Sequence, residues 1–133
     1  MPELSDKARK LFEDPNLLFV GTINADGSPQ VTPVWTELDN GHITFNTAVG
    51  RAKERNLRDD PRISVLVLDP ANQCRWVAVN GTASFREEDA DEHIDKLAKK
   101  YLGQDRYPWH DPEQQRIIVR IRPTRIDSSG FDD

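Results

Sequence analysis

Tight turns between short strand-like segments restrict this chain to a mainly antiparallel sheet. The Asp26-Gly27 and Asp39-Asn40-Gly41 turns are typical of hairpin loops, and each lies between segments rich in apolar and β-branched residues. Strands joined by such loops are neighbours that run in opposite directions. Closing the sheet into a small barrel would remove most of its exposed edges. We therefore predict a mainly β fold, a six-stranded antiparallel barrel with a few α-helices.

Nine elements are expected along the chain. The predicted strands cover residues 17–24, 30–38, 42–47, 62–69, 74–86 and 115–126, and the predicted helices cover 2–13, the segment from 50 to before Pro61, and 89–102. Pro33 cannot donate to a strand ladder, so its strand lies at an edge or is bulged. Gly81 predicts a kink. The apolar run at 63–68 predicts a strand that is buried on both faces, and the tail at 128–133 is expected to be loose.

Length and charge limit the classes of function. With 133 residues, the chain is expected to be a single domain, 1–133. Its net charge of −5 argues against a general nucleic-acid binder. A single cysteine, Cys74, allows no internal disulfide and fits a reducing compartment. No signal-peptide core and no apolar run of about 20 residues is present, so we expect a cytoplasmic protein that does not span a membrane.

One basic segment stands out from the acidic chain. Residues 50–62 contain five Lys or Arg residues against three acidic ones, a local charge of about +2. The segment follows a predicted strand and opens a predicted helix. Free N–H groups and the helix dipole favour negative charge at such a helix start. The segment therefore predicts a bound anion, although basic residues on a short helix are more often a solvated surface.

Four segments together resemble a known family. Residues 26–35, 43–47, 51–62 and 75–81, in this order of elements, are similar to the split β-barrel family that binds flavins and deazaflavins, the pyridoxamine 5'-phosphate oxidase-like superfamily. Within it, the chain resembles the actinobacterial branch that uses coenzyme F420. The resemblance extends from about residue 8 to 127. It implies a homodimer with a cofactor site near the interface between the two chains.

The resemblance also assigns site residues. The strand after the first hairpin would line the cofactor ring, with Gln30, Val31, Thr32, Pro33 and Val34. Asn46 and Thr47 would contact the polar chain of the cofactor, and Arg51, Ala52 and Lys53 its phosphate. Arg58 would lie along an anionic tail, and Trp76, Val77, Ala78 and Val79 would reach the cofactor across the dimer interface. The residue types agree with this assignment, because a ring needs an apolar slot and a phosphate needs cations.

Other residues receive simpler interpretations. His42, His93 and His110 share no metal-ligand spacing, so we interpret them as surface histidines and expect no metal site. Trp35 and Trp76 fit either a core or interface role or a ligand contact. No acid–base or nucleophile cluster is present, so an enzyme of this sequence would rely on a cofactor. Solvent, Tyr101, Tyr107 and His110 are all left open as the proton source.

These observations favour one function and leave two others open. The leading hypothesis is a coenzyme F420-dependent oxidoreductase that transfers hydride to an activated double bond, for example in quinones, tetrapyrroles or unsaturated lactones. The first alternative is the same fold with FMN, acting as an oxidase or flavin reductase. The second alternative is a non-catalytic carrier or sensor of the cofactor.

Overall fold

A computed structural model describes residues 2–131 of the chain. In chain order the elements are α1 (Asp6–Glu13), β1 (Leu18–Ile23), β2 (Pro29–Val34), β3 (Thr36–Asp39), β4 (His42–Ala48), α2 (Ala52–Asp59), β5 (Arg62–Asp69), β6 (Asn72–Arg86), α3 (Ala90–Leu102) and β7 (Arg116–Ser129). Within these residues, no helix has the length and apolar character needed to cross a membrane.

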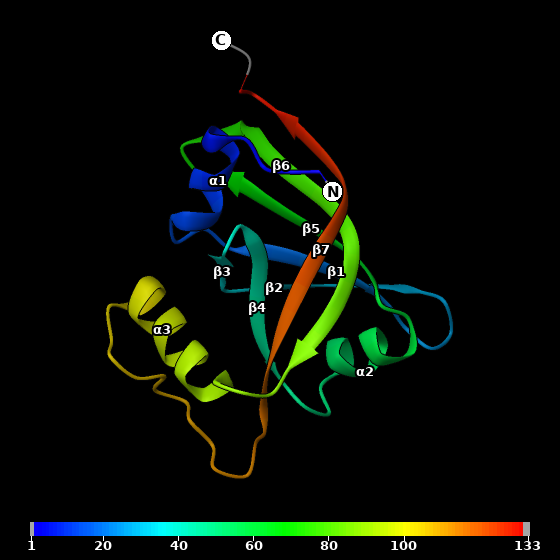
Figure 1. The fold of residues 1–133 in the computed structure, drawn as a ribbon, viewed down its shortest axis with the longest axis vertical. Coiled ribbons are helices and arrows are strands. Elements are labelled where there is room, and N and C mark those ends of the chain that lie inside the picture. Colours follow the sequence, from blue (N-terminus) through cyan, green and yellow to red (C-terminus); the bar gives the residue numbers. More distant parts are fainter. Residues whose placement is uncertain (1, 132–133) are drawn as a thin grey trace.

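The seven strands form one curled sheet. Its order is β2-β1-β5-β6-β7-β4-β3, and every neighbouring pair is antiparallel. The two edge strands, β2 and β3, are consecutive in the chain and only Trp35 separates them. The sheet must therefore bend until its edges approach each other, which gives the half-barrel of Figure 1. The predicted mainly β, antiparallel fold class is confirmed, as is the edge position of the strand that contains Pro33.

The predicted strand at 30–38 is two strands, so the sheet has seven strands rather than six. The main chain around Trp35 bonds to helix α3 instead of continuing one ladder. The Thr36 N–H donates to the Tyr101 hydroxyl at 3.1 Å, and the Thr36 carbonyl accepts from Lys100 Nζ at 2.6 Å. The Trp35 ring also stacks on Tyr101, with 5.4 Å between centroids. These contacts come from residues about 65 positions away, so local alternation could not reveal the break.

The core lies inside the curl, where α1 covers it. Helix α1 and the strands of the sheet both contribute core residues that are at most 2% exposed: Phe12, Leu18, Phe45, Val65, Val67, Val77, Val79, Val119 and Ile121. Fully burying one such aliphatic or aromatic side chain contributes about 1.5–3 kcal/mol. Ser5 begins α1 by accepting the Ala8 N–H, so the helix starts later than the predicted 2–13.

The sequence predicted that strand β5 is buried on both faces. Within one chain, only one of its faces is buried. Its burial alternates, with Ile63, Val65 and Val67 inside and Leu66 outward and 37% exposed. The apolar residues of the outer face therefore have no cover from the described part of this chain. The predicted burial on both faces is therefore wrong within one chain, because only one face of β5 packs on the core.

The long β6–β7 pair closes the sheet and includes the predicted kink. Its register shifts between Asn80 and Gly81, which confirms the irregularity at this glycine. The predicted loose tail is wrong at its start, because Ser128 and Ser129 pair with Val77 and Trp76 in the ladder. The end of that tail, 132–133, lies outside the described residues.

Lys100 of α3 holds three elements together. Its Nζ donates to the carbonyl oxygen of Phe12 at the end of α1 at 2.5 Å, and to that of Thr36 in β3. Burial lowers the pKa of Lys100 to about 8, while nearby carboxylates, Glu37 first, act in the opposite direction. Two main-chain carbonyl groups thus hold the Lys100 amine where burial disfavours its positive charge.

We expect Lys100 to make stability depend on pH. The unfolded chain binds the Lys100 proton more tightly than the folded protein, so the free energy of unfolding should rise with pH between about 8 and about 10.5. Urea denaturation across this range should show a smaller rise in Lys100→Met than in the unaltered protein. The neighbouring exposed Lys99→Met is the control and should retain the full rise. Equal slopes for Lys100→Met and the unaltered protein would contradict the expectation.

Candidate functional site

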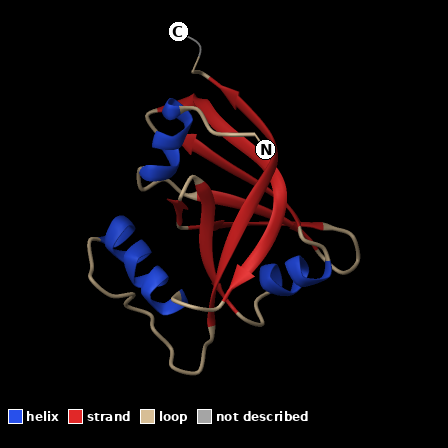
Figure 2. Cartoon of the chain, in the orientation of Figure 1, coloured by secondary structure: helices blue, strands red, loops and turns tan. Residues whose placement is uncertain are grey.

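A hollow of about 330 Å³, which we call the cation pocket, opens beside the end of β4 and the start of β7. In Figure 2, α2 and α3 lie on opposite sides of this end of the sheet. The hollow falls within the usual range of small-molecule sites, about 300–1,000 Å³. Its lining combines apolar, aromatic and basic side chains: Leu17, Pro33, Val34, Trp35, Asn46, Arg51, Lys53, Ile94, Leu97, Tyr107, Trp109 and Arg116.

Strand pairing brings the three cations of the pocket together. Ala48 at the end of β4 pairs with Arg116 at the start of β7. The chain then turns into α2, with Arg51 at the N-cap position and Lys53 in the first turn. The turn is held by Glu54, which accepts the Gly50 N–H at 2.8 Å. Arg51, Lys53 and Arg116 therefore meet beside the positive end of a helix.

The three cations have no acidic partner. Among residues 2–131, no carboxylate forms an ion pair with Arg51, Lys53 or Arg116. Burial, followed by the charges of Arg51 and Arg116, lowers the pKa of Lys53. Burial also lowers the pKa of Arg116; Arg51 acts in the same direction, and Tyr107 and the Asp91 carboxylate act against it. Three clustered cations without an ion pair repel one another in the free protein, and a bound anion would relieve that repulsion.

Polar side chains beneath the cations form a connected floor. Asn46 Oδ1 accepts from Arg116 Nε at 2.8 Å, and Asn46 Nδ2 lies 3.0 Å from His93 Nδ1. His93 is only 8% exposed, so its predicted surface position is wrong. The error has a clear cause: α3 turns this residue onto β4, where Thr44 Oγ1 lies 3.2 Å from Nε2.

Two predicted contact residues carry buried hydroxyls without a partner. Thr47 Oγ1 and Thr32 Oγ1 have no hydrogen-bond partner among the described residues. Buried polar atoms are nearly always paired, and an unpaired one is a place where a ligand can satisfy the bond. Neither threonine lines the cation pocket, so the cations there, and not these hydroxyls, are what fits the phosphate of a cofactor.

An aromatic wall adjoins the cations. Trp35 and Tyr107 meet edge to face at 6.0 Å, and Tyr107 and Trp109 do so at 5.6 Å. The Arg116 guanidinium lies 5.2 Å from the centre of the Tyr107 ring, which links the wall to the cation cluster. Trp109 is 63% exposed at the edge of the hollow. The pocket thus offers flat apolar surface next to positive charge, the pairing that a ring joined to an anion requires.

Five of the predicted site residues line the cation pocket, namely Pro33, Val34, Asn46, Arg51 and Lys53. Ala52 lies between the two cations in the first turn of α2. Val31 instead lines a hollow on the outer face of β1, β2 and β5, and the Gln30 amide oxygen accepts from Thr22 at 3.4 Å. The site prediction therefore divides into a group at the pocket and a group elsewhere.

The remaining predicted residues do not line the cation pocket. Arg58 donates to Glu54 at 2.8 Å and its guanidinium lies 4.0 Å from the Phe85 ring centre. Val77 and Val79 have fully buried side chains in the core, so only their main chain is available to a ligand. Trp76 and Ala78 alternate with them on the opposite face of β6 and are half-buried.

Arg116 and Trp109 are site residues that the sequence reasoning missed. In the sequence, Arg116 is one of several alternating arginines of the last strand. In the structure, Arg120 and Arg122 are exposed, whereas Arg116 is only 7% exposed. Its position as the first strand residue after a long polar loop is the available signal. Of the three proton-donor candidates, only Tyr107 lines the pocket.

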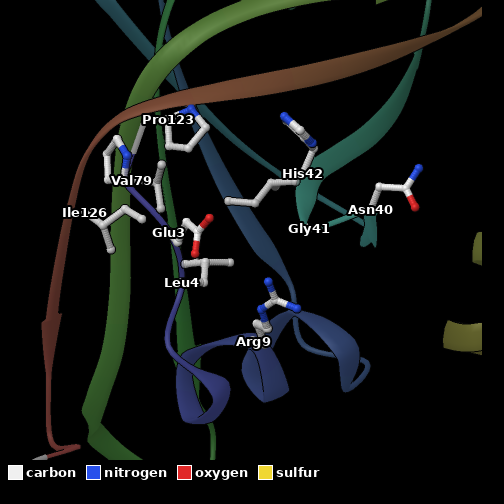
Figure 3. Close-up of a pocket in the computed structure, with 11 residues that line it drawn as sticks. Glu3, Leu4, Arg9, Asn40, Gly41, His42, Val79, Pro123 and Ile126 are labelled. Atoms are coloured by element: carbon white, nitrogen blue, oxygen red, sulfur yellow. The ribbon is translucent and has the colours of Figure 1, made fainter.

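Two other hollows differ in size and character. The enclosed one between the N-terminal segment, the β3–β4 turn and β7 is lined by Leu4, Arg9, His42 and Pro123 among others and measures about 70 Å³ (Figure 3). This volume suits water rather than a cofactor ring. The hollow on the outer sheet face is larger, about 630 Å³, and is mainly apolar.

Comparison with known proteins identifies the family. The model of the pyridoxamine 5'-phosphate oxidase family matches residues 4–130. A pyridoxine/pyridoxamine 5'-phosphate oxidase from Pseudomonas paraeruginosa is 29% identical over 124 residues, which are 90% of this chain and 55% of that protein. A second such oxidase, from Aeromonas hydrophila, is 36% identical over 64 residues, 47% of this chain and 30% of that protein. The chain therefore spans about half the length, or less, of these curated relatives.

Solved structures share the same fold. An F420 reductase superposes with a TM-score of 0.81 and 27% identity, over 93% of this chain and 98% of that one. A conserved hypothetical protein from Mycobacterium tuberculosis superposes with a TM-score of 0.75 and 26% identity, over 95% and 84% of the two chains. With the family model spanning nearly every described residue, this chain belongs to the pyridoxamine 5'-phosphate oxidase family.

Proposed function

We propose that this protein is a coenzyme F420-dependent reductase that passes hydride to the activated double bond of a conjugated small molecule. The cation pocket carries the proposal, because Arg51, Lys53 and Arg116 converge there without an acidic partner and beside an aromatic wall. Reduced F420, when bound, supplies the hydride. The protein supplies binding and orientation, in agreement with a pocket that contains no nucleophile paired with a base.

The pocket residues divide the work of holding the cofactor. Arg51, Lys53 and Arg116 would hold the phosphate with charge-assisted hydrogen bonds, aided by the N–H groups at the start of α2. Pro33, Val34 and Trp35 would face the ring. Tyr107 is the pocket's candidate proton donor to the reduced substrate.

The choice of F420 over FMN rests on how the whole chain compares. The F420 reductase superposes on 93% of this chain with a TM-score of 0.81 and 27% identity, and this likeness supports F420. FMN remains the alternative that the family description favours. The extended basic segment is weaker support for a tailed cofactor than its sequence suggested, because Arg58 pairs with Glu54 and Arg62 with Asp60.

A titration of the purified protein with F420 and, separately, with FMN tests the proposal. We expect saturable, micromolar or tighter binding of F420, followed by the fluorescence of the cofactor and of Trp109, and weaker binding of FMN. Reduced F420 should then be oxidised in the presence of a quinone or another conjugated acceptor. Tighter binding of FMN would transfer the proposal to an FMN oxidase or flavin reductase. Tight F420 binding without turnover on any acceptor would favour a carrier or sensor.

We further propose that the protein is a homodimer through the outer face of β1, β2 and β5. Val31 and Leu66 are 65% and 37% exposed there, around the apolar hollow of about 630 Å³. A continuous apolar surface of this kind is typical of an interface. A second copy on this face would place Val31, from the predicted cofactor strand, at the junction of the two chains.

Replacing Leu66 by aspartate should separate the subunits. A buried, unpaired carboxylate on each side of the interface costs several kcal/mol by order of magnitude. Light scattering should give twice the 15.2 kDa of one chain for the unaltered protein and a single chain for Leu66→Asp. Leu102→Asp is the matched control, since Leu102 is 41% exposed on α3 and should leave the dimer intact. A monomeric unaltered protein at micromolar concentration would exclude the dimer.

A further inference from the structure

A chain of hydrogen bonds runs from the protein surface to the cation pocket. Lys96 Nζ lies 3.2 Å from Glu37 Oε2, and His93 Nε2 lies 3.3 Å from Glu37 Oε1. His93 Nδ1 lies 3.0 Å from Asn46 Nδ2, and Asn46 Oδ1 accepts from Arg116 Nε at 2.8 Å. We call Glu37, His93, Asn46 and Arg116 the His93 chain. Its members come from β3, α3, β4 and β7.

Only one orientation of the Asn46 amide and one tautomer of His93 give every hydrogen bond of the His93 chain both a donor and an acceptor. Arg116 Nε is a donor only, so the oxygen of the Asn46 amide must face it. The Asn46 NH₂ group then serves the Ala90 carbonyl at 2.9 Å and His93. His93 Nδ1 must therefore accept, and its proton lies on Nε2, where Glu37 and Thr44 Oγ1 provide acceptors.

We propose that His93 is a positioning residue that holds the Arg116 side chain in the cation pocket through Asn46. Without the acceptor at Nδ1, the Asn46 NH₂ group keeps only the Ala90 carbonyl as an acceptor among the described residues, so the amide is held less firmly with its oxygen toward Arg116. The guanidinium would then lose its only buried side-chain acceptor, because its other side-chain bond is a 3.5 Å contact with Gln114. The consequence for cofactor binding rests on the proposed function, whereas the positioning itself does not.

Protonation of His93 should break the same chain. A ring that carries protons on both nitrogens presents a donor to the Asn46 NH₂ group. Turning the amide over would satisfy the ring but would set NH₂ against Arg116 Nε. The charged groups that face the His93 chain are Glu37 from β3, Lys96 and Asp91 from α3, and Arg116 from β7 with Arg51 beside it. Burial opposes the charge of Glu37, but hydrogen bonds from His93 and Lys96 outweigh it and lower the pKa of Glu37.

Nuclear magnetic resonance of the protein without cofactor tests the positioning. The ¹⁵N shifts of His93 should show the Nε2–H tautomer at neutral pH, and Arg116 Nε–H should give a sharp, slowly exchanging signal. His93→Leu should broaden or remove that signal. His93→Gln should retain it, because a glutamine amide can accept from Asn46 and donate to Glu37. His42→Leu is the control, since His42 contacts Arg120 at 2.9 Å on the surface and should leave Arg116 unchanged.

If His93→Leu does not fold, Asn46→Ser breaks the chain at its next member and should remove the same signal. A sharp Arg116 signal in either folded variant, or an Nδ1–H tautomer of His93, would overturn the proposal.

The affinity for F420 provides a second, independent test of the positioning role of His93. His93→Leu should weaken binding about fivefold, the effect of one hydrogen bond, and should have no further effect in an Arg116→Met background. Equal losses in both backgrounds would overturn the positioning role. If the unaltered protein binds neither F420 nor FMN, the proposed function fails while the resonance experiment still decides the role of His93.

Discussion

Replacing both Lys53 and Arg116 by methionine should lower the affinity for F420 about a thousandfold. Each side chain offers a charge-assisted hydrogen bond to the cofactor's phosphate, and bonds to charged groups contribute about 1.5–3 kcal/mol each. Two of them sum to about 4 kcal/mol, or about three powers of ten in the dissociation constant. The single replacements should each cost at least tenfold. Fluorescence titration with F420 measures all three variants.

Lys53→Met by itself should leave the free protein as stable as before. Burial and the nearby charges of Arg51 and Arg116 disfavour the charged form of Lys53 and lower its pKa. Removing this charge therefore relieves repulsion in the free protein. We therefore expect an unchanged or higher melting temperature for Lys53→Met, together with its loss of affinity. Arg120→Met, which removes an exposed cation of β7, is the control and should change neither quantity. An unchanged affinity in the double variant would remove the anion-binding role of the cation pocket.

Local signals in the sequence predicted the framework of the sheet. The Asp26-Gly27 turn joins β1 to β2, and the turn at Asn40-Gly41 joins β3 to β4, each between antiparallel neighbours. Pro33 lies on an edge strand, and Gly81 lies at a register shift. Each of these outcomes follows from the backbone chemistry of one or two residues, which is why they could be predicted without knowledge of the rest of the chain.

The contacts of the pocket could be predicted only in part. Arg51 and Lys53 were accessible because they cluster in sequence at a helix start. Arg116 and His93 reach the pocket through the pairing of β4 with β7 and the packing of α3, and Asn46 is separated from them by 70 and 47 residues. No periodicity encodes such a meeting. The break at Trp35 was missed for the same reason, since its cause lies on α3.

Replacing Gly81 by alanine should destabilise the fold by about 3 kcal/mol or more. A Cβ at this position would lie 2.3 Å from the Arg122 carbonyl oxygen and 3.0 Å from Ile121 Cγ2. The first neighbour is main chain, so relief requires strands β6 and β7 to move apart at the register shift in the longest pair of the sheet. Forcing a group into a packed interior costs about 1–3 kcal/mol, and more where backbone must shift. The melting temperature should fall by roughly 10 °C.

Gly21→Ala is the matched test of whether this cost is steric or reflects any loss of a strand glycine. Gly21 also lies in a strand without a positive φ, but its added Cβ would meet the Ser64 carbonyl oxygen only at 3.4 Å, an ordinary contact. We therefore expect Gly21→Ala to unfold within a few degrees of the unaltered protein. If both variants lost the same stability, the close approach of β7 to β6 would not be the reason for glycine at position 81. A large loss for Gly81→Ala alone would show that the close approach of the β7 main chain to β6 at the register shift is the reason for glycine at position 81.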